Sequence, residues 1–421
     1  MIWLVRIRFK SFIQNSVWFP PLIGMIMALL FHRVVMSIDM NMGWYASASV
    51  EGSRTILATL AASMFTFIVF VFSILLLSVQ LASAQLTPRV IVFFYRNPVL
   101  KFSLTVFVFT FAFTLAVLFR ISEQVLQLSL YIAVYSCLAC IAIFLFMIDH
   151  VGKSLRPIIL MNLVGNRGQK VLMNVYPNLL VNTESTENNP SPLETYSLLH
   201  TIETSRTGVI LAFNITGLAD LATRTNCIIE FIPQVGDFVT CGDPLFRLYE
   251  GGGNISNRQL QQMVAIGQER TLQQDPGFAF RILVDIAAKA LSPAINDPTT
   301  AVLALDQIHR LLRVVARRRL NTGQVFDKTG QLRLVYRTPN WDNFISLALT
   351  EIRCYGKDSI QVVRRMRALL DNLIDIVPPQ RAAALRVELE ILNRGVERDF
   401  YHPEDRAHAS VADSLGVGGT R

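Results

Sequence analysis

Charged residues are scarce in this sequence, and so are cysteines. Only 17% of its 421 residues are Asp, Glu, Lys or Arg, whereas 52% are hydrophobic, a balance that excludes an ordinary soluble protein. The five cysteines provide no disulfide framework, because only Cys137 and Cys140 are closely spaced and both lie inside an apolar run without further ligands. We expect this pair to serve in packing. The cysteine content fits a soluble part that stays in a reducing compartment, the cytoplasm.

Motifs that carry enzymatic chemistry are also missing. The sequence has no GxxxxGK[ST] phosphate loop, no HExxH and no GxSxG, and its six histidines lack ligand spacing. The glycines at 251–253 lack the strand-turn-helix context of a nucleotide-binding loop, so we expect a linker there. We therefore predict no catalytic residue, no metal site and no cofactor. An enzyme acting on a membrane substrate ranks behind two non-enzymatic functions.

Four long apolar runs occupy the first 156 residues. They cover residues 17–36, 56–86, 99–119 and 128–148, and each is long enough for an α-helix to cross a hydrocarbon core of about 30 Å. A cleaved signal peptide does not explain the first run, because the run is too long and the small-residue site at 46–48 lies too far downstream. The predicted fold is a membrane α-helical domain of four transmembrane helices at 1–156, followed by an α+β region.

The second run carries an uncharged stripe of polar and apolar residues. From Thr59 the run contains no charge before Arg89. Seven of its residues recur at alternating steps of four and three, which places them on one helix face: Thr59, Ser63, Thr66, Phe70, Ser73, Leu77 and Gln80. Such a stripe favours either a water-lined path or close helix packing in lipid. The amide of Gln80 favours the path, because it is costly in hydrocarbon without a partner.

Basic residues are concentrated on one side of the four runs. One side has Arg6, Arg8, Lys10, Arg89, Arg96, Lys101, Lys153 and Arg156, and the other has only Arg33, Arg54 and Arg120. By the positive-inside rule both termini are expected in the cytoplasm, with residues 1–10 as a basic interfacial segment. The net charge of +8 then reflects contact with anionic lipid, and we predict no nucleic-acid partner.

Beyond residue 156 the composition is that of a soluble α+β protein. Residues 157–253 are expected to form a small β-rich, barrel-like domain, with a mobile polar loop at 182–192. Its clearest part has two turns, Gly236-Asp237 and Gly242-Asp243, between three short apolar strands. This pattern resembles half of a biotinyl/lipoyl-type barrel sandwich, although the lysine that such domains modify has no counterpart here.

Residues 254–403 are expected to form a helical domain. Helical spacing covers 257–273, 276–291, 298–320, 341–355, 359–376 and 380–400, and a hairpin is expected at 324–336 around Gly330. The tail at 404–421 is polar and rich in glycine, so we predict that it is disordered.

Seven polar residues of the helical region form a candidate binding set. They are Glu269, Arg270, Asp275, Asp285, Lys289, Asn296 and Asp297. Asp285 and Lys289 are four residues apart on one predicted helix and can pair. Asp297 followed by Pro298 has the residue types of a helix N-cap and first helical position. The set is either a pocket for an ion, nucleotide or lipid headgroup, or a capped and salt-bridged helix junction, and capping favours the junction.

Two motifs connect the sequence with a known family. One is SAQLTPRV at 83–90. The other begins with GQERT at 267–271, continues through Asp275-Pro276 and ends with DIAAKALSPAINDPTTA at 285–301. Together with the four runs they resemble the bacterial family of predicted integral membrane proteins named domain of unknown function 2254. The resemblance covers nearly the whole chain and implies a multi-pass protein of the bacterial cytoplasmic (inner) membrane. It implies no activity.

Two functions remain open on these observations. The first is a homo-oligomeric ion channel or channel-like permeation protein, with the second transmembrane helix lining the path and with ions as possible cargo. The alternative is a membrane-anchored regulatory or scaffolding protein with a cytoplasmic binding module. In both, the lipid bilayer is a partner. The first needs a homo-oligomer, because four spans with one polar stripe cannot enclose a water path alone.

Overall fold

The computed structural model describes residues 3, 12–13, 16–46, 49–121, 125–154, 156–180, 193–194, 196–252, 255–320 and 323–416. The chain divides into two compact units, which we call the span unit (Arg8–Ile159) and the mixed unit (Met1–Ile7 and Leu160–Arg421). The expected interfacial segment at 1–10, apart from Trp3, and the expected mobile loop at 182–192 lie outside the described residues.

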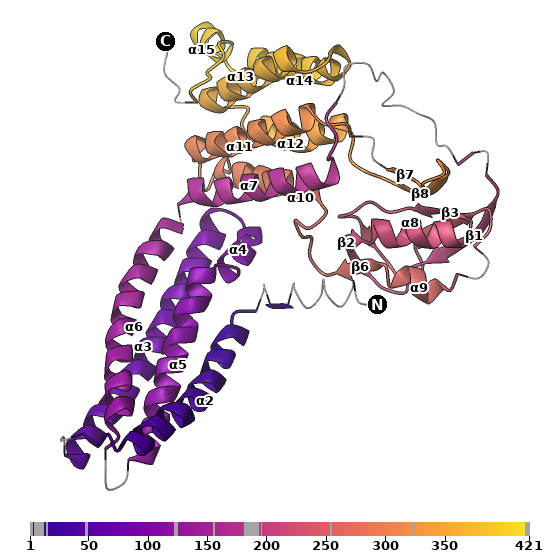
Figure 1. Ribbon diagram of the computed structural model, residues 1–421. Helices are drawn as coiled ribbons and strands as arrows, with labels where there is room; N and C mark the ends of the chain where they lie inside the picture. The colour runs from indigo at the N-terminus through magenta and orange to yellow at the C-terminus, as the bar shows by residue number, and fades with distance from the viewer. Residues whose placement is uncertain are drawn as a thin grey trace. The chain divides into compact units, whose positions relative to one another are not determined.

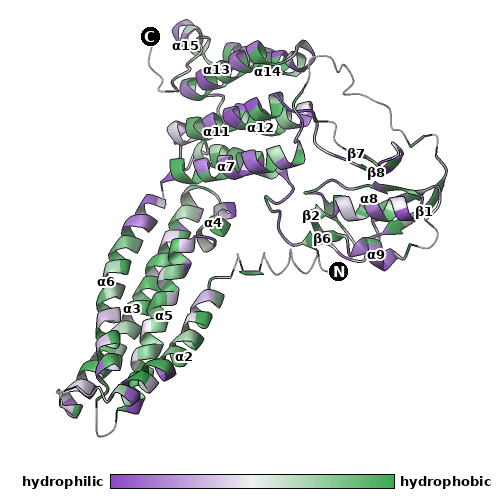
Figure 2. Cartoon of the chain, viewed as in Figure 1, coloured by the Kyte–Doolittle hydropathy of each residue, from purple (hydrophilic) through white to green (hydrophobic). Residues whose placement is uncertain are grey.

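The span unit is built from four long apolar helices. These are α2 (Phe19–Met42), α3 (Val50–Gln85), α5 (Pro98–Arg120) and α6 (Gln127–Ser154), and each is long and apolar enough to cross a membrane. Figure 2 shows hydrophobic residues over most of their length. α5 packs against α2, α3 and α6. A short 3-10 helix η1 (Pro88–Val90) and α4 (Ile91–Tyr95) connect α3 to α5. The prediction of four membrane helices is therefore confirmed.

The α2–α3 and α5–α6 connections meet at one end of the span unit, which we call the loop end. The Ala46 N–H donates to Val125 O at 2.9 Å, and the Gln127 N–H donates to Trp44 O at 3.1 Å. α2 extends to Met42, six residues beyond the predicted end, because Asp39 is fully buried and hydrogen-bonded there. A charged residue near the end of an apolar run thus continues the helix instead of stopping it.

The helices of the mixed unit lie in three layers, which can be followed in Figure 1. α7 (Pro157–Val175) and α10 (Pro276–Ala290) form the first, α11 (Pro298–Ala316) and α12 (Trp341–Tyr355) the second, and α13 (Ile360–Ile376) and α14 (Pro379–Asp399) the third. Helix α15 (Pro403–Ala409) packs against α13. The helices expected at 276–291, 341–355, 359–376 and 380–400 are confirmed to within a few residues.

The strands of the mixed unit form two sheets. The first has the order β1-β5-β3-β8-β7 and the second β4-β2-β6. Their bounds are β1 Leu198–Glu203, β2 Gly208–Phe213, β3 Ile228–Phe231, β4 Phe238–Val239, β5 Pro244–Tyr249, β6 Val264–Gly267, β7 Gln324–Phe326 and β8 Leu332–Tyr336. β3 and β8 pair in parallel and the remaining pairs are antiparallel. The short helices α8 (Ile215–Arg224) and α9 (Asn257–Gln261) complete this region.

The structure does not show the expected barrel-like module, and the described residues contain no closed barrel. The two Gly-Asp turns carry the chain from β3 in one sheet to β4 in the other, and then back to β5. Gly236 and Gly242 have φ values of +98° and +94°, as the third position of a type II turn requires. In each turn the aspartate side chain accepts a hydrogen bond from the N–H three residues earlier, at 2.8 Å for Asp237 and 2.7 Å for Asp243.

Three further expectations differ from the structure. Residues 157–175, expected to be part of the β-rich domain, are helical in α7. The segment 257–273 contains the short α9 and strand β6, which pairs with β2, instead of one helix. Residues 403–416 form α15 and an ordered end, in which Arg364 Nε donates to Val411 O at 3.0 Å, whereas a disordered tail was expected from 404. Residues 417–421 lie outside the description.

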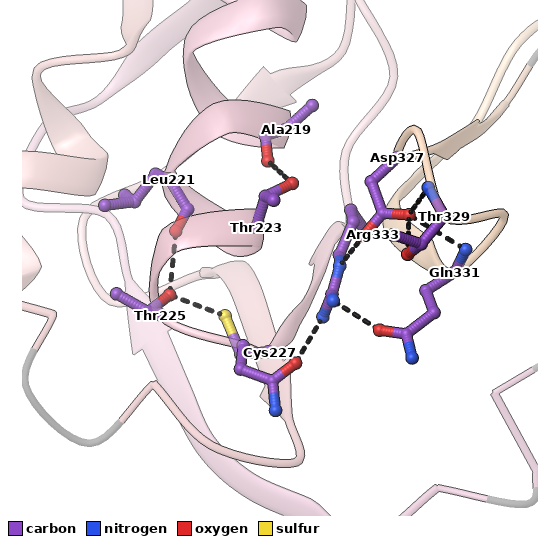
Figure 3. Close-up of polar contacts among 10 residues, drawn as sticks. Ala219, Leu221, Thr223, Thr225, Cys227, Asp327, Thr329, Gln331 and Arg333 are labelled. Carbon is purple, nitrogen blue, oxygen red and sulfur yellow. Dashed lines mark hydrogen bonds and ion pairs between the residues drawn. The ribbon is translucent and has the colours of Figure 1, made fainter.

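The β7–β8 hairpin joins the first sheet and is held by a buried arginine. Asp327 accepts hydrogen bonds from the N–H groups of Thr329 (2.8 Å) and Gln331 (3.0 Å) and from Arg333 Nε (2.7 Å). Figure 3 shows Arg333 beside Asp327. Arg333 Nη1 also donates to Asn226 Oδ1 at 2.9 Å, which connects the hairpin to the loop after α8. The Thr329 hydroxyl and the Arg333 guanidinium hold the pKa of Asp327 well below its usual range. The hairpin, from the region expected to be helical, thus pairs with a strand of the region expected to be β-rich.

Candidate functional site

The polar stripe of α3 lies on the face that the chain leaves uncovered. All seven predicted residues are exposed: Thr59, Ser63, Thr66, Phe70, Ser73, Leu77 and Gln80. The side of α3 that packs within the span unit is formed by Leu57, Ala61, Met64, Val71, Leu75, Val79 and Ala82. The two sets are offset by two residues, or about 200° at 3.6 residues per turn. Most of the stripe therefore points away from α5 and α6, whereas the ring of Phe70 lies beside α6, with its centroid 6.3 Å from that of Phe144.

Most hydroxyls of the stripe already have a partner on their own helix. Thr59 donates to Thr55 O at 2.8 Å, Thr66 to Ala62 O at 3.2 Å and Ser73 to Val69 O at 2.9 Å. A hydrogen bond to a carbonyl of the same helix lowers the cost of placing a hydroxyl in lipid. These residues are therefore compatible with either lipid or water opposite them. Gln80 differs, because its amide has no hydrogen-bond partner within the described part of the chain.

The stripe residues are exposed, whereas several other polar residues of the span unit point into its interior. Ser103, Thr110 and Thr114 of α5 are buried inside the unit, as is Ser129 of α6. On α3 the residues beside the stripe are apolar and exposed, including Phe65, Phe72 and Leu76. Ser53 and Ser78 of α3 are buried too. The stripe residues of α3 instead form a narrow band between apolar surfaces, on the outside of the chain.

In the mixed unit, the structure does not gather the seven polar candidates into one pocket. Asp275 is buried and N-caps α10, accepting from Phe278 N–H at 3.0 Å. Arg270 Nε donates to its carboxylate at 2.8 Å. Burial raises the pKa of Asp275, and the guanidinium of Arg270 opposes this shift. An ideal Cβ on Gly236 would lie 2.6 Å from Asp275 Oδ2, so the first Gly-Asp turn packs directly on this pair. Glu269 is exposed beside it.

Asp285 belongs to a second ion-pair group. Its carboxylate accepts from Arg281 Nε at 2.6 Å, and Arg281 also makes a bidentate pair with Glu351 of α12 at 2.5 Å. Arg281 is a partner of Asp285 that the sequence did not suggest, because an (i, i−4) partner and an (i, i+4) partner such as Lys289 are equally placed on a helix. Lys289 lies in the last turn of α10.

Asp297 and Asn296 form the third local group, at the start of α11. Asp297 is the N-cap, and its carboxylate accepts from Thr300 N–H at 3.0 Å and from the Thr300 hydroxyl at 2.5 Å. Asn296 precedes it with φ +48°, in the left-handed region that asparagine tolerates. The predicted capping role of Asp297 is confirmed, and the three groups together fit a helix junction better than a single binding site.

Two features of the structure were not found from the sequence. Asp39 of α2 binds the start of α6, accepting from the N–H groups of Leu128 and Ser129 at 2.9 Å and from the Ser129 hydroxyl at 2.7 Å. The other is a cavity of about 680 Å³ in the mixed unit, lined by residues from both sheets and from the helices. Its lining combines segments up to 165 residues apart in the chain, from Asn174 to Pro339, so local patterns carried no signal for it. Among the described residues no group of three His, Cys, Asp or Glu side chains is placed to hold a metal ion.

Comparison with known proteins places these features in a family. A family model described as "Predicted membrane protein (DUF2254)" matches residues 14–372. Proteins described as uncharacterized from Mycobacterium bovis and Mycobacterium tuberculosis are each 27% identical to this chain over 416 residues, covering 94% of it and 79% of their own length. No solved structure matches the chain. Because the model covers all four apolar helices and both motifs, the chain belongs to the DUF2254 family of predicted membrane proteins.

Proposed function

We propose that this membrane protein is a homo-oligomeric permeation protein for ions, with the α3 stripes of several copies lining the path. The observation that carries the proposal is the exposure of all seven stripe residues on the face of α3 opposite its packed side. A polar stripe that served packing within one chain would be covered by that chain. An exposed stripe needs another copy, water or lipid opposite it.

Several copies are required because the described residues of the span unit form one such stripe. Stripes related by a symmetry axis would face each other across that axis, and the exposed apolar residues beside them would contact neighbouring copies or lipid. Phe70 and Leu77 are 53% and 55% exposed and interrupt the hydroxyl groups. Two rings of such side chains in a narrow path exclude water and act as a dewetting gate.

The proposal includes an orientation in the bacterial inner membrane. Both termini and the mixed unit are placed in the cytoplasm, and the loop end of the span unit faces outside, in keeping with the excess of basic residues at the opposite end. Reporter insertions at Gly43, which is exposed with no atom near its Cβ position, and fusions after Arg421 test this orientation. An exported C-terminus would contradict it.

Thiol labelling in membranes tests the path itself. In a variant without the native cysteines, we expect single cysteines at Ser63, Thr66 and Ser73 to react with a water-soluble maleimide. Matched cysteines at Val69 and Phe72 are exposed in the chain but lie beside the stripe, and they should stay unreactive in lipid or at a protein contact. Equal labelling at both sets, or none at either, contradicts a water-lined α3.

The alternative function is a membrane-anchored regulatory or scaffolding protein. The large cavity in the mixed unit favours it, because a binding module needs a site of this kind. Under this alternative the α3 stripe contacts another helix or lipid, and stripe cysteines remain unreactive. Neither function assigns a catalytic step to the chain.

A further inference from the structure

The mixed unit contains a cavity of about 680 Å³ where its sheets meet its helices. The walls come from the end of α7, the turn after β3, the residues before α10, the residues after α11 and the β7–β8 hairpin. Pockets that bind small organic ligands have volumes of about 300–1,000 Å³. The cavity is therefore of the right size for such a ligand.

The charge around this cavity is positive. Arg319 and Arg337 line it, and no Asp or Glu is present among its described lining residues. Arg337 is exposed and makes no hydrogen bond or ion pair with the described part of the chain. Guanidinium groups bind phosphate or carboxylate through two parallel hydrogen bonds. The lining therefore favours an anionic ligand.

Side-chain amides give the cavity a second chemical character. Asn174, Gln234 and Gln273 line it, and their amides have no hydrogen-bond partner among the described residues. Gln274 is different, because its Oε1 accepts from Phe213 N–H at 3.0 Å and its Nε2 donates to Phe213 O at 3.2 Å. Each free amide offers a donor beside an acceptor, which matches the edge of a nitrogen heterocycle. An inorganic anion lacks the planar ring edge in which a donor and an acceptor stand side by side.

Aromatic rings complete the lining. Phe213 and Tyr336 lie edge to face with their centroids 5.1 Å apart. Phe326 of β7 also lines the cavity and is 55% exposed, a large apolar surface without a cover in the described chain. Aromatic rings of this kind stack on planar rings, and stacking on a nucleobase contributes about 1–3 kcal/mol to the binding free energy.

We propose that this cavity binds a nucleotide, a planar nitrogen heterocycle that carries phosphate. Arg319 and Arg337 hold the phosphate, the free amides contact the edge of the ring, and the aromatic side chains contact its face. This site is independent of ion permeation and remains if the protein is an anchored regulator.

Binding to the full-length protein in detergent tests the proposal. The probes are ATP, GTP, AMP and GMP, with adenosine, guanosine and inorganic phosphate as comparison arms, measured by calorimetry and by the shift in unfolding temperature. We expect at least one nucleotide to bind with a Kd below about 1 mM, and its nucleoside and inorganic phosphate each to bind about tenfold more weakly or worse. Gln273→Ala should weaken the nucleotide and leave inorganic phosphate unchanged.

Charge variants locate the phosphate. Arg319→Ala and Arg337→Ala should each weaken nucleotide binding about tenfold or more, the size of a lost charged hydrogen bond. Arg317→Ala is the matched control, since Arg317 is exposed in the same loop but does not line the cavity. If an alanine variant fails to fold, Arg337→Lys keeps the charge and should still bind less tightly. Absence of nucleotide binding at about 1 mM, equal affinity for inorganic phosphate, or indifference to both lining arginines would overturn the assignment.

Discussion

At the scale of single residues, Asp39 shows how an apolar unit uses a buried charge. It accepts three hydrogen bonds at the first turn of α6, whose N–H groups have no partner within their own helix. The favourable interaction of a carboxylate with a helix N-terminus adds to these bonds. Sequence reading could not identify this role, because the two partners lie about ninety positions apart in the chain.

We expect Asp39→Ala to destabilise the span unit substantially. The change leaves buried N–H donors without a partner, at a cost of about 1–3 kcal/mol each. Asp149→Ala is the control, since its ion pair with Lys153 is more than half exposed on both sides and worth about 0.5 kcal/mol. Thermal unfolding in detergent compares the two variants. Equal losses would mean that Asp39 acts as an ordinary surface charge.

His309 makes the stability of the mixed unit depend on pH. Arg365 donates to its Nδ1 at 3.1 Å, so the ring is neutral and its Nε2 donates to Asn372 Oδ1 at 2.9 Å. Burial lowers the pKa of His309, with the charges of Arg365 and Arg313 adding to the shift and Asn372 and Asp306 opposing it. The folded state therefore binds fewer protons than the unfolded state below about pH 6.5.

Stability should accordingly fall as the pH drops through about 6.5, and the fall should stop below the lowered pKa of the folded state. Urea unfolding of the wild type at about pH 8 and about pH 5.5, monitored on the mixed unit, measures this loss. In His309→Gln, which lacks a titrating ring, the loss over the same interval should be smaller. An identical pH dependence in both proteins would remove His309 as the cause.

At the scale of elements, the sequence predicted the features that depend on the residues of a single helix or hairpin. The spans, the cap at Asp297 and the hairpin around Gly330 follow from local residue types, and the structure has all of them. α7 was missed because residues 157–253 were all assigned to one β-rich domain. Gly168 allows close packing, since an ideal Cβ there would lie 2.6 Å from Ala279 Cβ and 3.3 Å from Leu311 Cδ1.

Gly168→Ala should therefore destabilise the mixed unit, although alanine is the better helix former. The added methyl group forces α7 away from α10 and α11, at a cost of about 1–3 kcal/mol. Gly395→Ala in α14 is the matched control, because its Cβ position meets no atom closer than 3.8 Å. There the substitution should stabilise by up to about 1 kcal/mol. Chemical denaturation of both variants measures the difference, and a gain at Gly168 would refute the close contact.

At the scale of the whole molecule, the sequence could not predict which distant strands pair with each other. The first sheet takes β8 from a segment about a hundred positions beyond β3, and the two Gly-Asp turns connect separate sheets instead of closing a barrel. The residues of a turn predict that the chain reverses direction there, but they do not predict which strand pairs with the segment that follows. The same limit applies to the α3 stripe, whose residues the sequence identified and whose exposure it could not predict.

Conductance of reconstituted bilayers tests the central claim, that the α3 stripe lines a path. Leu77 lies in the stripe and Leu76 lies about 100° away on the same helix, and their side chains are 55% and 54% exposed. Leu77→Ser should raise the conductance above that of the wild type, because it wets the narrow part of the path. Leu76→Ser should leave it unchanged. Silent bilayers with Leu77→Ser, or equal increases with both variants, would contradict permeation along α3.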